Sequence, residues 1–453
     1  MMYDLGIIGA GPAGYVAAER AGQKGLKTVL FDKEYIGGVC LNVGCIPTKT
    51  LLHTAKQYSE AQNGKRYGLS VDNVSYDLPR VMKRKEKIVK KLVGGIKAQL
   101  KQGHVEVVMD EASIKSYSEE KIVISANETE YQCKNILIAT GSEPIIPPIP
   151  GLKREAIYTN KEILEISEIP ESLAIVGGGV IGMEFADFFN AMGSKVTVIE
   201  MLDEIISGAD KQIAGMLRSQ LTKRGIDIKL GAKVTSIESN TLTYQEGEAS
   251  NTISADAILL SVGRKPVTNI SGIEQLGLHF NKSGIAIDEF GQTNRSNVYA
   301  AGDITGHSMF AHTASREGEV VVNHILGEEE SMNYNAVPAV VYTHPEVSGV
   351  GVTEEEAAQQ NIDYQVHSLS MSFAGRFVIE SERINGLCKI ITAGKSQKII
   401  GVHILGDPSS ELIFGGVLAI EQGMTLQDFR KSIFPHPSVS EILKETSFID
   451  ADD

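Results

Sequence analysis

The feature that most constrains this chain of 453 residues is a glycine-rich motif that occurs twice. The pattern G-x-G-x-x-G spans residues 9–14 and again 177–182, each time between a strand-like apolar run and a helical run. In each copy an acid ends the next strand 23 residues after the first glycine: Asp32 follows Gly9, and Glu200 follows Gly177. A strand, a glycine turn and a helix in this order predict a βαβ unit that binds a dinucleotide pyrophosphate at the helix N-terminus.

The glycines of each copy have separate tasks: the tight turn, the approach of the pyrophosphate and close helix packing. They are Gly9, Gly11 and Gly14 in the first copy, and Gly177, Gly179 and Gly182 in the second. Both acids are expected to accept hydrogen bonds from ribose hydroxyls, and the acids that follow Glu200 would repel a 2′-phosphate, which favours NAD over NADP. The repeat therefore predicts an α/β chain with two Rossmann-like domains and two bound dinucleotides.

Two of the four cysteines, Cys40 and Cys45, lie five residues apart in the run GGVCLNVGCIPTK at residues 37–49. In a regular helix their Cα atoms would be about 8–9 Å apart, beyond the roughly 7 Å that a disulfide allows. The pair can join only where the backbone departs from a helix, which Gly37, Gly38 and Gly44 permit. Pro47 tolerates a helical turn that begins just after Cys45, and a helix N-terminus there would favour a thiolate. The spacing suits a closed, reducible ring, with two separate buried thiols as the alternative.

Charge and composition limit the partners and the compartment. The formal net charge is −14, which argues against nucleic acid or an anionic membrane as a main partner. The basic run at 81–102 is expected to be a solvated helical face, with RNA binding as the alternative. The sequence shows no apolar run of membrane-spanning length and opens on a strand-like run, not a signal peptide. We expect a cytoplasmic protein, where a disulfide tends to be catalytic or redox-sensing.

Four segments are expected. Residues 1–150 would form the first domain, which ends in a proline-rich crossover after Thr140-Gly141-Ser142, and residues 151–263 would form the second, which ends at Gly263. Residues 264–334 would return to the first domain and bring Asp303 to a strand end, as a cofactor ligand or a turn cap. Residues 335–453 read as a separate α+β unit without a phosphate loop, with a strand expected at 336–343.

This last unit ends with a histidine suited to thiol chemistry. His436 precedes a proline and lies five residues before Glu441. Histidine titrates near neutral pH, as a base for thiols must, and Glu441 could fix its tautomer. A lone His-Pro is more often a turn. Cys133 and Cys388 are expected to be structural thiols, His104, His307 and His344 are expected to be structural, and no metal cluster is predicted.

Together the motifs resemble the flavin-dependent pyridine nucleotide–disulfide oxidoreductases, and most closely those that oxidise dihydrolipoamide. The resemblance runs over residues 3–446. Four motifs in the same order carry it: the cysteine run at 37–49, the two phosphate loops, the Gly302-Asp303 segment, and His436-Pro437 with Glu441. Departures are small: Asp32 stands where glutamate is common, and Thr48 and Thr50 stand where serine and alanine are frequent.

The resemblance assigns roles to individual residues. FAD would be held by the first loop and by Asp32, Ala112, Thr140, Gly141, Ser142, Asp303 and Ala311. NAD would be held by the second loop and by Glu200, Val234 and Gly263. Lys49 would lie beside flavin N5 and pair with Glu184, Cys45 would face the flavin, and Cys40 would exchange with the substrate. His436 and Glu441 would come from the other subunit of a homodimer, which makes residues 335–453 a dimerisation domain.

The implied reaction is the oxidation of dihydrolipoamide on a lipoyl domain, with NAD+ as acceptor and an acyltransferase core as assembly partner. Other disulfide reductases of the family are the alternative. A glutathione reductase would be expected to place arginines after the second strand, where this chain has acids, and a mercuric reductase would need a terminal cysteine pair. A docking or redox-sensing subunit with little turnover is the rival from another class.

Overall fold

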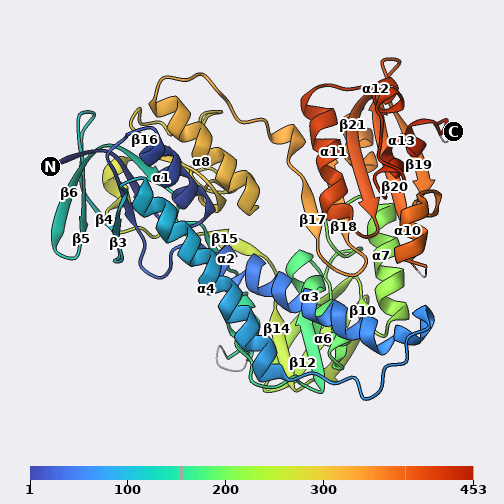
Figure 1. The fold of residues 1–453 in the computed structure, drawn as a ribbon. Coiled ribbons are helices and arrows are strands. Elements are labelled where there is room, and N and C mark those ends of the chain that lie inside the picture. The colour runs from blue at the N-terminus through green and yellow to red at the C-terminus, as the bar shows by residue number, and fades with distance from the viewer. Residues whose placement is uncertain (154–156, 383, 452–453) are drawn as a thin grey trace. The chain divides into compact units, whose positions relative to one another are not determined.

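The structure is a computed structural model that describes residues 1–153, 157–382 and 384–451 (Figure 1). The chain forms two compact units. The first comprises Met1–Thr50, Asp77–Ile145 and Gly263–Met332, and the second comprises Leu51–Tyr76, Ile146–Val262 and the residues from Asn333 onward.

The first unit is built on a parallel sheet in the order β3-β2-β1-β6, with β16 beside β6. The strands are β1 (Met2–Ile8), β2 (Thr28–Phe31), β3 (Glu106–Val108), β6 (Thr129–Ile138) and β16 (Val298–Ala300). All four residues of β2 are buried, as expected of a parallel strand that is covered on both faces.

Strand β6 also joins this sheet to an antiparallel meander. The first half of β6 pairs with β5 (Ile122–Ala126), which pairs with β4 (Ser113–Tyr117). The sequence predicted only the buried end of β6, residues 135–138. The missed half, which includes exposed Thr129 and Glu130, lacks a continuous apolar signal.

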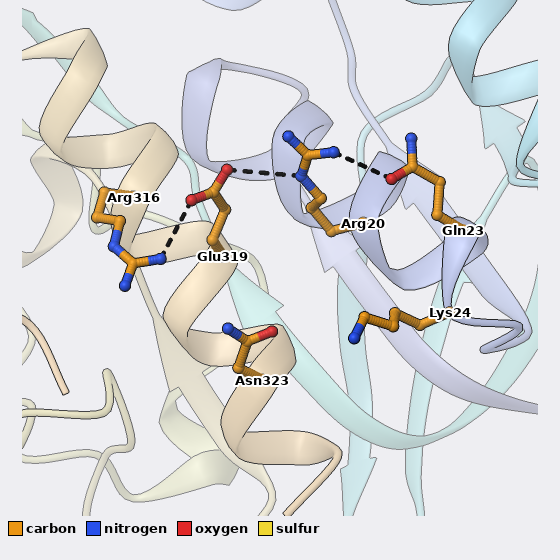
Figure 2. A pocket seen from close by; sticks show the side chains of 6 residues that line it. All are labelled: Arg20, Gln23, Lys24, Arg316, Glu319 and Asn323. Carbon is orange, nitrogen blue, oxygen red and sulfur yellow. Dashed lines mark hydrogen bonds and ion pairs between the residues drawn. The ribbon is translucent and has the colours of Figure 1, made fainter. Parts of the chain in front are cut away.

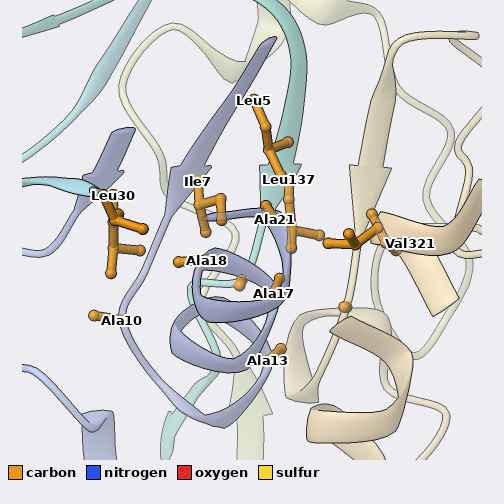
Figure 3. Close-up of a cluster of buried hydrophobic side chains, with 14 of the residues drawn as sticks. Leu5, Ile7, Ala10, Ala13, Ala17, Ala18, Ala21, Leu30, Leu137 and Val321 are labelled. Carbon is orange, nitrogen blue, oxygen red and sulfur yellow. The ribbon is translucent and has the colours of Figure 1, made fainter. Parts of the chain in front are cut away.

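Three helices accompany the sheet of the first unit: α1 (Pro12–Gln23), α4 (Leu78–Gln102) and α8 (Ala311–Ile325). Figure 3 shows the alanines of α1 beside strand residues such as Ile7 and Leu137. Ala13, Ala17, Ala18 and Ala21 are almost completely buried, so small side chains let this helix approach the sheet closely. Helix α4 begins three residues earlier than predicted, because the carboxylate of Asp77 caps it by accepting from the amide of Arg80 at 3.1 Å.

The second unit repeats this architecture. Its parallel sheet has the order β10-β9-β8-β14, and a three-stranded antiparallel sheet β11-β12-β13 accompanies it. These strands are β8 (Ser172–Val176), β9 (Lys195–Ile199), β10 (Asp227–Lys229), β11 (Ala232–Glu238), β12 (Thr241–Glu246), β13 (Ala249–Ser254) and β14 (Ala257–Leu260). The helices are α5 (Asn160–Ile163), α6 (Val180–Ala191) and α7 (Lys211–Lys223).

The C-terminal part of the second unit is a five-stranded antiparallel sheet in the order β17-β18-β21-β20-β19. The strands are β17 (Ala339–Val341), β18 (Val347–Gly351), β19 (Tyr364–Ser370), β20 (Leu387–Ala393) and β21 (Lys398–Leu405). The helices are α9 (Glu354–Gln359), α10 (Gly375–Glu380), α11 (Ser409–Glu421), α12 (Leu426–Lys431) and α13 (Glu441–Ser447). The strand predicted at 336–343 is wrong at both ends, since a 3-10 turn, η5 (Tyr334–Ala336), precedes the short β17.

The remaining elements connect these layers. They are α2 (Gly38–Val43), α3 (Cys45–Gln62), η1 (Gly64–Tyr67), β7 (Ser142–Pro144), β15 (Arg264–Pro266), η3 (Ile273–Leu276), η4 (Asp303–Thr305) and η6 (Met371–Phe373). Strands β7 and β15 pair antiparallel. The predicted fold class, two dinucleotide-binding architectures followed by an α+β unit, is confirmed.

Candidate redox and nucleotide-binding site

The two closely spaced cysteines lie on either side of a helix break. Cys40 belongs to α2, and Cys45 is the first residue of α3. Between them Gly44 has φ −145° and ψ −114°, outside the helical region. A Cβ at Gly44 would lie 2.9 Å from the carbonyl oxygen of Val39, so a side chain there would force the turn open. The departure from a helix that the spacing required is therefore present at Gly44, one of the three glycines expected to permit it.

The two thiols are in contact and share a hydrogen bond. Both are thiols rather than halves of a disulfide in this structure. The hydrogen bond with Cys45, then burial and the charge on Cys45, raise the pKa of the Cys40 thiol, and the nearby Lys49 ammonium opposes this shift. The raised pKa favours the protonated form of Cys40, and the N-terminus of α3 favours a thiolate at Cys45.

Two residues that sequence reasoning did not select lie near the thiols. Tyr15 packs with Cys40 on the core cluster of the first unit, and burial, then the charges at Cys40, raises the pKa of its phenol. Burial lowers the pKa of Arg264, against the opposing charges of Asp303 and Cys45. Each directly follows a glycine to which a cofactor role was assigned, and this adjacency is the signal that could have found them.

Arg264 anchors a polar network on the paired strands β7 and β15. Its Nε donates to Oγ of Ser142 at 2.7 Å, and its Nη2 donates to the carbonyl oxygen of Ser142 at 2.6 Å. The hydroxyl of Ser142 in turn donates to Oδ2 of Asp303. These hydrogen bonds join three segments of the first unit that are far apart in sequence. Two of the joined residues, Ser142 and Asp303, are predicted to hold the flavin nucleotide.

Both glycine loops have the geometry that a pyrophosphate site requires. Gly9 and Gly177 each have φ +106°, and a Cβ at either would lie 2.2 Å or 2.5 Å from a carbonyl oxygen of the neighbouring strand end. Gly11 and Gly179, by contrast, have no atom within 4 Å of an added Cβ, and they are the N-caps of α1 and α6 without a side-chain cap. The residues present therefore fit a phosphate group at each helix N-terminus.

The third glycine of each loop serves packing. A Cβ at Gly14 would lie 1.8 Å from the carbonyl oxygen of Gly9, and one at Gly182 would lie 2.0 Å from that of Gly177. No side chain fits these gaps. This agrees with the predicted task of the third glycine, which is to let the helix lie close to the turn before it.

The acids that follow each loop hold its backbone in the same way. Oδ2 of Asp32 accepts from the amide of Ala10 at 2.7 Å, and Oε2 of Glu200 accepts from the amide of Gly178 at 2.5 Å. The second oxygen of each carboxylate accepts from backbone amides that follow it in the chain. Each carboxylate thus fixes the turn between the first two glycines of its own loop.

The remaining residues predicted to hold FAD or NAD lie at the ends of strands and helices or within a strand. Ala112 is buried just before β4, Ala311 is the first residue of α8, and Val234 lies in β11 opposite Tyr244. The hydroxyl of Thr140 donates to the carbonyl oxygen of Val267 at 2.8 Å. Gly141 and Gly263 have φ of +69° and +113°, a range that favours glycine. Their contacts with cofactors stay predictions.

Glu184 is a buried residue of α6, and its Oε1 accepts from the amide of Tyr342 at 3.0 Å. This contact lies wholly within the second unit. Lys49 belongs to the first unit, so its pairing with Glu184 stays a prediction.

His436 and Glu441 form the predicted pair in the second unit. Nδ1 of His436 lies 2.9 Å from Oε1 of Glu441, whose Oε2 accepts from the amide of Ser438 at 2.9 Å. The amide of Ser438, then the hydrogen bond with His436, lowers the pKa of the Glu441 carboxyl. The imidazole side chain is 80% exposed, so the ring is held at one nitrogen while most of its surface faces solvent.

A second histidine–carboxylate pair lies in the same unit. Nδ1 of His344 is 2.8 Å from Oδ2 of Asp407, and Nζ of Lys56 is 2.6 Å from the same oxygen. The hydrogen bond to His344 and the charges on His344 and Lys56 outweigh burial and hold the pKa of Asp407 well below its usual range. Sequence reasoning took His344 for structural; its contacts tie β17, β21 and α3 together.

A surface pocket of about 240 Å³ lies between α1 and α8 in the first unit. Figure 2 shows Arg20, Gln23 and Lys24 on one side and Arg316, Glu319 and Asn323 on the other. Glu319 forms ion pairs with both arginines, at 3.5 Å and 3.2 Å, while Lys24 and Arg316 also pair with Glu328 and Glu330 outside the lining, so each cation here has an acidic partner.

Residues 1–153, 157–382 and 384–451 contain no group of three or more metal-ligating side chains. Within the same part of the chain, no helix has both the length and the apolar character needed to cross a bilayer.

Comparison with known proteins gives the family. The model of the pyridine nucleotide–disulphide oxidoreductases matches residues 3–318, and that of their dimerisation domain matches residues 337–447. The dihydrolipoyl dehydrogenase of Geobacillus stearothermophilus is 37% identical, over 97% of this chain and 94% of its own length. That of Mycoplasma genitalium is also 37% identical, over 98% of each chain.

Solved structures agree. LpdA from Mycobacterium tuberculosis superposes with a TM-score of 0.90 at 25% identity, covering 98% of this chain and 99% of its own. The HOCl-induced flavoprotein disulfide reductase RclA from Escherichia coli superposes with a TM-score of 0.86 at 30% identity, covering 99% and 100%. With these matches over nearly its whole length, the chain belongs to the pyridine nucleotide–disulphide oxidoreductase family.

Proposed function

We propose that this chain is a dihydrolipoyl dehydrogenase, which oxidises a dihydrolipoyl dithiol with FAD as internal carrier and NAD+ as acceptor. The observation that carries the proposal is the contact between Cys40 and Cys45 across the break at Gly44, with Lys49 one turn into α3. The 37% identity to dihydrolipoyl dehydrogenases over the whole chain supports the choice of substrate.

The two loops divide the cofactors. FAD is assigned to the first loop with Asp32, Ala112, Thr140, Gly141, Ser142, Asp303 and Ala311, and NAD to the second loop with Glu200, Val234 and Gly263. The open space at Gly11 and Gly179 supports a phosphate at each helix N-terminus. FAD supplies a two-electron carrier between the thiols and the nicotinamide. Lys49, paired with Glu184, places positive charge beside Cys45 and the ring.

The thiol half-reaction follows from the cysteine geometry. His436 takes a proton from the substrate dithiol, and the resulting thiolate attacks Sγ of Cys40 in the oxidised pair. The Cys40–Cys45 bond breaks, and Cys45 leaves as a thiolate at the N-terminus of α3. The second substrate thiol then attacks the substrate sulfur of the mixed disulfide and releases Cys40, which takes up a proton. The raised pKa of Cys40 supports this final state, with the proton on Cys40 and the charge on Cys45.

The dimerisation domain at residues 337–447 supports a homodimer. In the proposal, His436 and Glu441 of one subunit serve the cysteines of the other, and residues 335–453 form the interface domain. Residues 1–150 and 264–334 are assigned to the FAD-binding part, and residues 151–263 to the NAD-binding part. The substrate is carried on a lipoyl domain of a cytoplasmic multienzyme complex with an acyltransferase core.

A steady-state assay of the purified dimer tests the proposal. Dihydrolipoamide and reduced glutathione are supplied in parallel, each with NAD+ and with NADP+. Turnover with dihydrolipoamide and NAD+ is the expected result. A yellow protein that reduces other disulfides with a nicotinamide but leaves dihydrolipoamide unoxidised would instead be another reductase of the family, as the likeness to RclA allows. A colourless protein without turnover would indicate a docking subunit.

A further inference from the structure

Helix α4 presents an exposed face that is almost entirely basic. Of its charged side chains only Glu86 is acidic, whereas the exposed basic ones number eight in a chain whose net charge is −14. They are Arg80, Lys83, Arg84, Lys87, Lys90, Lys91, Lys97 and Lys101. Among the described helices, this face carries the largest excess of positive charge, opposite in sign to the net charge of the chain.

The lysines form a stripe at helical spacing. Lys83, Lys87 and Lys91 follow one another at four-residue steps, and Lys90 lies beside them. Residues three or four apart are neighbours on a helix, so like charges at these spacings destabilise it. None of these four lysines forms an ion pair with any residue that the structure describes. Glu86, three residues after Lys83 and four before Lys90, offsets part of this repulsion, whereas Lys87 and Lys91 have no acid at these spacings.

Two glycines interrupt the same helix. Gly94 and Gly95 lie in the interior of α4, where glycine lowers helix stability. No atom lies within 4 Å of a Cβ built on either one, so the absence of a side chain is not required by packing inside the chain. Leu92 beside them is 40% exposed. This part of the helix leaves room for a close approach from outside, with the exposed Leu92 as the helical neighbour of Gly95.

The helix that carries the stripe also packs against the redox segment. Val93, Ile96 and Leu100 belong to the same core cluster as Tyr15 and Cys40. Helix α4 lies against α2, which contains Cys40. Nearer its start, Nη1 of Arg84 donates to the carbonyl oxygen of Thr50 in α3 at 3.1 Å. A molecule bound on the stripe would thus be held on the element that supports the thiols.

We propose that the α4 stripe, defined as Lys83, Lys87, Lys90 and Lys91 with Gly94, Gly95 and Leu92, is a docking face for an acidic protein domain that carries the dithiol substrate. The inference rests on the proposed function. Charge complementarity supports this occupant. A basic stripe on an otherwise acidic protein attracts an acidic partner and steers its approach, whereas the rest of the acidic surface repels that partner. A free dithiol of low molecular weight needs no such face.

The test compares two variants that change the net charge equally. The first is Lys83→Glu/Lys87→Glu/Lys91→Glu on the stripe. The matched control is Lys115→Glu/Lys282→Glu/Lys395→Glu, at three exposed lysines outside α4. Each holoenzyme is assayed for kcat/KM with free dihydrolipoamide and with a reduced lipoyl-bearing domain of net negative charge, at low and high ionic strength.

The stripe variant is expected to lose about tenfold in kcat/KM for the carrier domain at low salt, because steering contributes factors of this order. Screening by salt should remove most of the difference. The control variant should keep the wild-type value, and all three proteins should oxidise free dihydrolipoamide equally, which also shows that they are folded.

Equal losses in both triple variants, or none in either, would overturn the docking face. Binding of single-stranded RNA or of vesicles with anionic lipid by the wild type, lost in the stripe variant while carrier turnover is unchanged, would overturn it in favour of another polyanion. If the wild type leaves even free dihydrolipoamide unoxidised, the proposed function fails instead, and the two failures are distinguishable.

Discussion

The amide of Gly178 donates a hydrogen bond to Oε2 of Glu200, with a donor–acceptor distance of 2.5 Å. The carboxylate that is expected to select the ribose therefore also holds the turn that is expected to bind the pyrophosphate. Ala10 and Asp32 repeat the arrangement in the first unit at 2.7 Å. Because one side chain serves both tasks, changes at either acid should affect affinity and local order together.

Glu200→Gln tests the nucleotide assignment. The amide side chain keeps the length of the original but removes the charge that disfavours a 2′-phosphate. We expect the KM for NAD+ to rise about tenfold and the preference for NAD+ over NADP+ to fall, measured as the ratio of kcat/KM values. Asp32→Asn is the matched change in the other loop and should leave that ratio unchanged. An unaltered ratio in Glu200→Gln would argue against a role for this acid in nucleotide choice.

Cys45→Ser and Cys40→Ser separate the two thiols. Either change should abolish turnover of dihydrolipoamide, because no exchangeable disulfide can form. NADH-dependent reduction of an artificial dye should persist in both. Only Cys40→Ser should retain a thiolate beside the flavin, visible as a long-wavelength absorption band, because the N-terminus of α3 favours the thiolate of Cys45. Full dihydrolipoamide turnover by Cys45→Ser would contradict the scheme.

His436→Gln should lower kcat/KM for dihydrolipoamide about 10²–10⁴-fold, the usual range for loss of a general base. Glu441→Gln should have a smaller effect of the same sign. The pKa of Glu441 is lower in the folded protein than in the unfolded chain. Its carboxylate is therefore charged at any pH above the unfolded pKa, and its support of His436 is lost only as the pH falls through the lower folded pKa. A pH–rate profile from pH 5 to 9 should therefore show no limb from Glu441. A limb within this range that vanishes in Glu441→Gln would contradict this.

A buried ion cluster in the second unit should govern alkaline stability. Nζ of Lys389, with its side chain 2% exposed, lies 2.8 Å from Asp210 and 2.9 Å from Glu354. Burial by itself would lower the pKa of Lys389, but the hydrogen bonds and charges of the two carboxylates outweigh it and raise that pKa. The stabilisation is thus complete below the unfolded lysine pKa and is lost as pH rises through the folded value.

Lys389→Met should reduce the free energy of unfolding by about 3–5 kcal/mol at pH 7, because it leaves the buried carboxylate of Asp210 without its cation. Denaturant unfolding of the apo and holo dimers measures this change. The double variant Lys389→Met/Asp210→Asn should recover part of the loss. A single variant as stable as the wild type would show that the carboxylates find other partners.

The sequence by itself determined the features that are local in the chain. The two glycine loops, the acids 23 residues later and the break between Cys40 and Cys45 depend on backbone conformations that glycine permits and on helix geometry over a few residues. These requirements depend only on the spacing of residues along the chain, so they could be predicted from the sequence. Asp32, Glu200, Gly44 and the pairing of His436 with Glu441 were all found where the spacing placed them.

Only the tertiary structure decided contacts between distant segments. Ser142 meets Arg264 across 122 positions and Asp303 across 161, and Lys389 meets Asp210 across 179. Strands β12 and β13 are half-exposed and polar, so their pairing leaves little apolar periodicity to detect. Nothing in one sequence tells which buried charge will find which partner, because that choice is made by the packing of whole elements rather than by the residues nearby.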